Sequence, residues 1–426
     1  MNPVAVAAKG KGAGNLVRRA SVIGSRYGLG PGRMERRLDA VLEIAARDGF
    51  RPTLPVTAAA AERHPRTIAR YAEHGIEFAV HGLYHVDHSR LTAVEQVEQL
   101  GRARRVLQDL GVPATGFRAP YLRWNPGTLH ALRENGFLYD TSQAVHVPIR
   151  AELETDTYRR VLGFYSSVSA AERPSLPRVD EGLVRLPCSI PDDEAALDRL
   201  GLSPEAIAGI WLDAHRETHD RGELLTLAVH PERIEPCALG IEAVLDQARL
   251  ARPAVWIASL EEIARWWLER SASTVSVDAV SGDRFHVRAT GPPGLTLLAR
   301  DVDVDAVTGP WADGWVRVRA TEFDLRASRR PFIGVSPDSA EALPRFLGEQ
   351  GYVVETVASG EAHARFLRLP TFTPAHERGV LAELEGDRSP LLRLGRWPHG
   401  ARSALALTGD VDALTIFDYA LRFVGR

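Results

Sequence analysis

Two histidines near residue 80 have a spacing that could bind a metal ion. His81 and His85 follow the apolar run 76–80 and are four positions apart, with Asp87 and His88 just beyond. A helical turn would bring His81, His85 and His88 to one face. Clustered neutral imidazoles suit zinc or a similar divalent ion. A lone pair of histidines is often structural, so this prediction depends on the surrounding sequence.

Two further segments end in side chains that could take part in chemistry. Residues 116–121 read Gly-Phe-Arg-Ala-Pro-Tyr, so that Arg118 could hold a carboxylate and the turn at Tyr121 could direct backbone N–H groups outward. The apolar run 224–229 leads directly to His230. Taken singly, the turn is typical of a strand exit, and a histidine at the end of a strand is more often structural than catalytic.

The elements that must position these residues alternate between strands and helices. Apolar runs predict strands at 51–57, 76–80, 116–118, 137–140, 183–186, 224–229 and 254–258. Helical periodicity predicts helices at 32–48, 65–74, 93–110, 126–135 and 260–269. This alternation favours a parallel α/β sheet or barrel, and the candidate residues all lie at strand C-terminal ends, where such folds carry their chemistry.

The order of these segments resembles the polysaccharide deacetylase family, also called carbohydrate esterase family 4. The resemblance covers residues 34 to about 267 and implies a deformed (β/α) barrel and a divalent metal, with zinc expected. By position it makes His81 and His85 metal ligands and His230 the general acid. It also implies that Arg118 orients the catalytic acid and that Tyr121 offers its backbone N–H to the oxyanion. Asp192 and Asp193 fall near the family's variable acidic segment.

The family's first motif, an acidic pair, is missing where it should precede residue 34, because residues 22–28 contain no carboxylate. A similar pattern follows the apolar run 404–408, with Asp410 as a candidate base and Asp412 as a candidate third ligand. Residues two apart on a strand share a face, so both side chains could enter one pocket. Circular permutation, donation from a partner chain, the start of a second domain and an ordinary solvated turn all remain open, as does a ligand role for Asp87 or His88.

Length and texture predict more than one domain in these 426 residues. We expect a mobile tail at 1–20, a deacetylase-like barrel at 21–270, a small β-rich domain at 271–330 and an α/β segment at 331–426 that ends in the acidic strand. Apolar residues are 45% and charged residues 25% of the chain, and the net charge of -3 gives no general attraction to nucleic acid. The arginine-rich, lysine-poor composition suggests a bacterial source with a GC-rich genome.

Neither a secretory signal nor a membrane span of about 18 apolar residues is evident, and only Cys188 and Cys237 are present. We therefore expect a cytoplasmic protein whose partner is an acetylated sugar or sugar precursor, with a homo-oligomer left open. The leading hypothesis is metal-dependent removal of an N-acetyl group from an amino sugar. The alternatives are hydrolysis of a non-sugar amide on the same fold and a degenerate sugar-binding or scaffolding protein.

Overall fold

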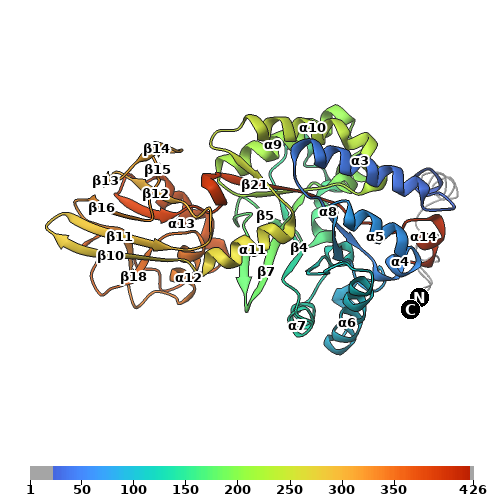
Figure 1. The fold of residues 1–426 in the computed structure, drawn as a ribbon, viewed down its shortest axis with the longest axis horizontal. Helices are drawn as coiled ribbons and strands as arrows, with labels where there is room; N and C mark the ends of the chain where they lie inside the picture. The colour runs from blue at the N-terminus through green and yellow to red at the C-terminus, as the bar shows by residue number, and fades with distance from the viewer. Residues whose placement is uncertain (1–22, 423–426) are drawn as a thin grey trace.

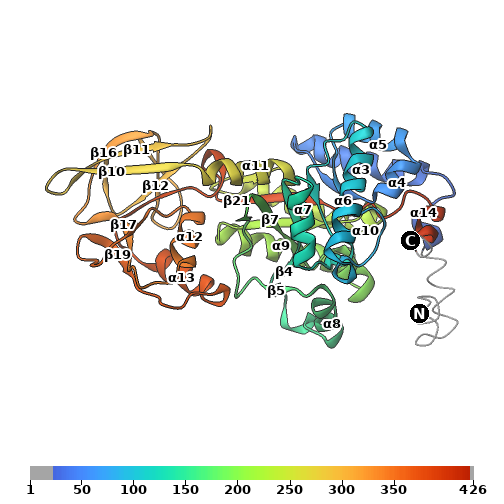
Figure 2. The same cartoon turned by 90° about the horizontal axis from the view of Figure 1, so that it is seen from below.

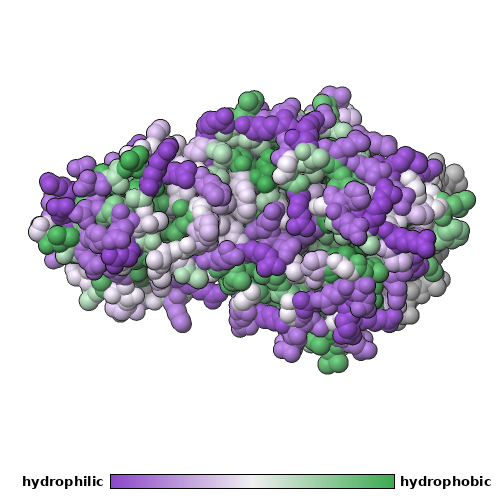
Figure 3. Space-filling view, in the orientation of Figure 1, coloured by the Kyte–Doolittle hydropathy of each residue, from purple (hydrophilic) through white to green (hydrophobic). Residues whose placement is uncertain are grey.

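The computed structural model describes residues 23–422, so the expected tail at 1–20 lies outside the described residues. The molecule is elongated, with a large α/β part at one end and a smaller β-rich part at the other (Figures 1 and 2). Polar and apolar side chains are mixed over the face drawn in Figure 3. Within the described residues, no helix combines the length and apolar character needed to cross a membrane.

The helices begin and end close to where the sequence predicts. Helix α3 (Gly32–Asp48) buries Met34, Leu38 and Val41 on one face and ends at Gly49, whose φ of 69° is left-handed. Reciprocal side-chain caps start several others, as at Thr92 and Glu95. The remaining helices are α4 (Ala58–Arg63), α5 (Pro65–Glu73), α6 (Ala93–Asp109), α7 (Pro126–Glu134), α8 (Asp156–Tyr165), α9 (Pro204–Asp220), α10 (Ile234–Leu250), α11 (Leu260–Ser271), α12 (Ala342–Glu349), α13 (Pro374–Gly386) and α14 (Ile416–Leu421).

One ten-stranded sheet organises the α/β part. Its strand order is β6-β7-β4-β3-β2-β1-β21-β8, with β5 on β4 and β9 on β21, and every pairing except β6 with β7 is parallel. Its strands are β1 (Thr53–Val56), β2 (Glu77–Val80), β3 (Gly116–Phe117), β4 (Tyr139–His146), β5 (Val168–Ser169), β6 (Arg178–Asp180), β7 (Leu183–Ile190), β8 (Leu224–Ala228), β9 (Val255–Ile257) and β21 (Ser403–Thr408).

The backbone ladders of this sheet do not close into a complete barrel. Among residues 23–422, no backbone ladder joins β7, the second strand in this order, to β8, the last one. The two strands are instead linked through side chains: the Ser189 backbone N–H donates to Thr226 Oγ1 at 2.6 Å, and the Thr226 N–H donates to Ser189 Oγ at 3.1 Å. The sheet is therefore curved enough for its two ends to meet.

Strand β21 comes from far along the chain yet lies inside this sheet. It pairs with β8 along residues 404–408, with β9 at its start and with β1 at Thr408. All six of its residues are buried. Position 409, directly after β21, requires glycine. Strand β21 passes so close to β8 that a Cβ there would lie 1.7 Å from the Val229 carbonyl oxygen. The structure thus places the C-terminal strand in the sheet of its own chain (Figure 1).

Three small sheets make up the β-rich part. Their orders are β10-β11-β16-β13, β14-β15-β12-β20 and β18-β17-β19, and α12 and α13 pack beside them. The strands are β10 (Thr274–Ser281), β11 (Arg284–Thr290), β12 (Leu297–Arg300), β13 (Asp303–Asp305), β14 (Thr308–Pro310), β15 (Val316–Val318), β16 (Glu322–Arg326), β17 (Arg330–Val335), β18 (Val354–Thr356), β19 (His363–Leu367) and β20 (Leu391–Leu394). The chain then returns through Trp397, which is buried against Trp267, to enter β21.

Candidate metal centre and active site

The carboxyl ends of the parallel strands bring the histidine pair and the C-terminal acids together. His81 Nε2 lies 3.4 Å from Asp412 Oδ1, and His85 Nε2 lies 3.2 Å from the same oxygen. One donor atom from each of the three residues lies within 4.8 Å of the others. Two imidazoles and a carboxylate form a donor set that suits a zinc-like ion with room for water or substrate.

The atoms that face this point fit a metal ion. His81 Nε2 and Asp412 Oδ1 are buried and have no hydrogen-bond partner among the described residues. The other ring nitrogen of His81, Nδ1, lies 2.9 Å from the Arg118 carbonyl oxygen, so an Nδ1–H would donate there and leave the Nε2 lone pair free. Burial lowers the pKa of His85 to about 4, which keeps that imidazole neutral and able to ligate.

Asp410 lies beside the cluster and is held by an arginine. Arg118 Nη1 donates to Asp410 Oδ1 at 2.9 Å, and Asp410 Oδ2 is 3.6 Å from His81 Nε2. Burial raises the pKa of Asp410, but His81 and Arg118 outweigh that effect and hold the pKa below its usual value. The carboxylate is therefore charged at neutral pH and can accept a proton from a nearby water.

His230 enters the same cavity from the end of β8 with a carboxylate behind it. Its Nδ1 lies 2.7 Å from Asp193 Oδ1, and its backbone N–H donates to Asp193 Oδ2 at 2.8 Å. Burial alone would lower the pKa of His230, but Asp193 raises it well above its ordinary value. His230 is thus a protonated imidazole at neutral pH. The family resemblance puts Asp193 near the variable acidic segment but does not predict its contact with His230.

Tyr121 lies at the rim of the cavity in a left-handed conformation, with φ 59° and ψ 13°. The residue is 39% exposed, and its ring packs edge-on against His85 at a centroid distance of 4.4 Å. The strained turn is a feature that functional sites commonly carry.

The segment after β2 is a loop, which corrects the helical turn expected from the sequence. Gly82 has φ +81°, and the structure has no helix until the short 3-10 turn at His88–Arg90. His88 therefore does not join the metal cluster; it is buried against Phe117. Asp87 is also directed elsewhere, since it accepts from Ser89 and pairs with Arg123.

Arg422 is a site residue that sequence reasoning missed. It follows α14 and places Nη1 2.8 Å from Asp412 Oδ2, and Nη2 2.9 Å from His85 Nδ1 and 3.1 Å from His85 Nε2. No motif signals it, because its position depends on how the chain turns after Asp412. The cavity itself has a volume of about 60 Å³. Its lining residues are His85, Arg118, Tyr121, Leu122, Phe164, Tyr165, Cys188, Asp192, Glu194, Ala228, His230, Gly409, Asp410, Asp412 and Arg422.

Comparison with known proteins finds similarity that includes the N-terminal part of the sheet. Residues 21–139 match the family model described as polysaccharide deacetylase. A peptidoglycan deacetylase-like protein from Gibberella zeae is 27% identical over 227 residues, 49% of this chain and 67% of that protein. A solved structure of a candidate polysaccharide deacetylase from Mycobacterium smegmatis is 26% identical, with a TM-score of 0.41 over 56% of this chain and 77% of its own. An allantoinase structure is 19% identical, with a TM-score of 0.42 over 53% and 70%.

The family model covers the histidine pair and Arg118 but stops before the acids that complete the cluster. Asp410 and Asp412 reach it only because β21 lies between β1 and β8. Residues 21–139 are therefore similar to the polysaccharide deacetylase family, as is the stretch matched by the curated relative.

Proposed function

We propose that this protein is a metal-dependent hydrolase that removes an N-acetyl group from an amino-sugar substrate. The observation that carries the proposal is the convergence of Asp410 and Asp412 on His81 and His85 from a strand more than 300 residues away in the sequence. The deacetylase family match and the peptidoglycan deacetylase-like relative support the substrate class.

His81, His85 and Asp412 would hold the metal, for which zinc is the best match to two imidazoles and one carboxylate. A bound divalent ion supplies the acidity that lowers the pKa of water and polarises an acetyl carbonyl. The Nδ1 contact of His81 with the Arg118 carbonyl would orient that ligand from behind, and Arg422, which lines the cavity, would hold Oδ2 of Asp412.

The remaining residues divide into a base and an acid. Asp410, kept ionised by Arg118, would take the proton of the attacking water. His230, kept protonated by Asp193, would give a proton to the leaving amine nitrogen. The backbone N–H of Tyr121 would donate to the oxygen that becomes negative in the tetrahedral intermediate. Two groups with pKa values shifted in opposite directions are typical of acid and base partners.

Acetate release tests this proposal. We expect the protein to release acetate from N-acetylglucosamine oligomers, EDTA to remove the activity, and Asp410→Asn to lower kcat by about 10²-fold or more. Cyclic amides assayed in parallel separate sugar from non-sugar hydrolysis. Sugar binding that is unaffected by EDTA, with no acetate released, would instead support a degenerate binding protein.

A further inference from the structure

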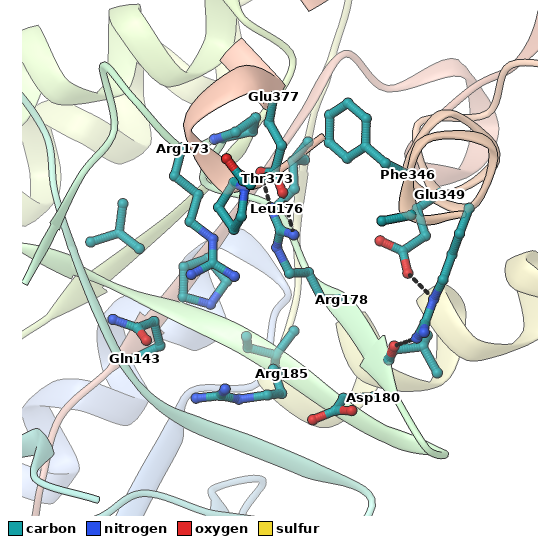
Figure 4. A pocket seen from close by; sticks show the side chains of 18 of the residues that line it. Gln143, Arg173, Leu176, Arg178, Asp180, Arg185, Phe346, Glu349, Thr373 and Glu377 are labelled. Carbon is teal, nitrogen blue, oxygen red and sulfur yellow. Dashed lines mark hydrogen bonds and ion pairs between the residues drawn. The ribbon is translucent and has the colours of Figure 1, made fainter. Parts of the chain in front are cut away.

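A larger cavity, separate from the metal centre, lies between the ten-stranded sheet and helices α12 and α13 (Figure 4). Its volume is about 310 Å³, within the range of sites for small organic ligands, which begins at about 300 Å³. Strands β4, β6 and β7 and the segment 173–176 form one wall. Its apolar surface comes from Val145, Leu176, Leu186, Phe346 and Phe372.

The charged side chains of this cavity do not balance. Arg178 pairs with Glu377 through both guanidinium nitrogens, with Nη1 to Oε1 at 2.8 Å. Arg345 lies 3.6 Å from Glu349. The third carboxylate of the lining, Asp180, is 2.7 Å from Arg133, which lies outside the cavity lining. Of the two remaining arginines of the lining, Arg185 lies 3.4 Å from Asp140, outside the lining, and Arg173 has no carboxylate partner among residues 23–422.

Arg173 has no hydrogen bond or ion pair from its side chain within residues 23–422, although it is only partly exposed. Figure 4 shows it extending into the cavity on the side of Gln143 and Arg185. Burial, together with the positive charges of Arg178 and Arg185, lowers the pKa of Arg173 to about 10. A partly buried guanidinium group beside two other positive charges would be stabilised by an anion that enters the cavity.

Arg185 adds a second set of donors. Its Nη2 is buried without a hydrogen-bond partner, and its Nε is 3.4 Å from Asp140. The guanidinium is 4.0 Å from the ring centroid of Trp124, so its plane is held in place on an aromatic face.

We propose that this cavity binds a small organic anion through a phosphate or carboxylate group held by Arg173 and Arg185, with its body against Phe346 and Phe372. The site is distinct from the metal centre, because the two cavities have no lining residue in common. The inference does not depend on the proposed hydrolase activity.

Calorimetric titration of the full chain in low-chloride buffer tests the site with three ligands of similar body: glucose 1-phosphate, glucuronate and glucose. We expect at least one of the two anions to bind, with the tighter one identifying the preferred group, and glucose not to bind. Arg173→Gln should weaken the binding by about tenfold or more, because a charge-assisted contact is lost, and Arg173→Lys should weaken it less. Binding should also fall as salt is added.

Arg216→Gln is the matched control, since Arg216 is an exposed arginine of α9 that pairs with Asp213 in the preceding turn. It should leave the affinity unchanged. The proposal is overturned if neither anion binds, if glucose binds as well as the anions, or if Arg173→Gln binds as tightly as the wild type while its circular dichroism spectrum is unchanged.

Discussion

Arg118 and Asp410 form the contact on which the proposed base depends. An arginine beside a carboxylate commonly lowers its pKa by about one to three units. Replacing Arg118 by Gln should therefore raise the pKa of Asp410, so that the carboxylate becomes protonated at a higher pH and the acid limb of kcat/KM moves up by about one unit or more. Measuring the pH profile checks this. Arg118→Lys, which keeps a charge, should shift the limb less. If neither variant shifts the limb, Asp410 is not the base.

The contact between Asp193 and His230 predicts an effect on the alkaline limb of the pH profile. A general acid must be protonated, so activity falls as the pH rises through its pKa. Burial favours the neutral ring, but Asp193 raises the pKa of His230 and moves this alkaline limb upward. Asp193→Asn should lower the pKa and shift the alkaline limb of kcat toward neutral pH. Glu217→Gln, which breaks the ion pair of Glu217 with Arg221 at the end of α9, serves as the control and should leave both limbs in place.

At the scale of elements, the approach of β21 to β8 requires a residue without a side chain at position 409. Alanine there would press its Cβ against the Val229 carbonyl oxygen, and a backbone atom cannot move away as a flexible side chain can. Gly409→Ala should lower the free energy of unfolding by at least about 2 kcal/mol. Urea denaturation measures this change.

Gly163 in α8 is the matched glycine, because a Cβ there meets nothing within 4 Å. Gly163→Ala should be neutral or should stabilise the protein by up to about 1 kcal/mol through helix propensity. Equal effects of the two substitutions would mean that β21 and β8 are not packed as described.

Much of the local structure around the site could be predicted from the sequence. Capping residues and apolar periodicity predict α3, α6, α7 and α11, and the apolar run before Asp410 predicts β21. The turn after His81 was expected to be helical but is a loop, because Gly82 takes a positive φ that breaks the helical pattern. The strands β4 and β7 also extend several residues beyond their predicted ends, to His146 and Ile190.

Across the whole molecule, the features that the sequence could not reveal depend on contacts between distant residues. Strand β21 lies between β8 and β1, and β1 precedes it by more than 300 residues in the chain. No local sequence pattern can specify this pairing. Arg422 reaches Asp412 only after the chain turns into α14. The free arginine Arg173 can be recognised only when the partners of Arg178 and Arg345 are known.

This topology makes a prediction about backbone protection. Buried strands in the middle of a sheet open only in large unfolding events, whereas exposed edges exchange readily. The amides of β21 should therefore exchange with deuterium about as slowly as those of β8 and much more slowly than those of the exposed strand β13. Hydrogen exchange followed by mass spectrometry checks this, and fast exchange across residues 403–408 would contradict the place of β21 in the sheet.

The metal content of the purified protein tests most directly whether the C-terminal strand completes a metal site in its own chain. Elemental analysis after dialysis against metal-free buffer should find about one zinc-like ion per wild-type chain. His85→Ala and Asp412→Ala should lose it, whereas Asp87→Ala should keep it because Asp87 pairs with Arg123 instead. Metal retained in Asp412→Ala, or absent from the wild type, would contradict a site built from His81, His85 and Asp412.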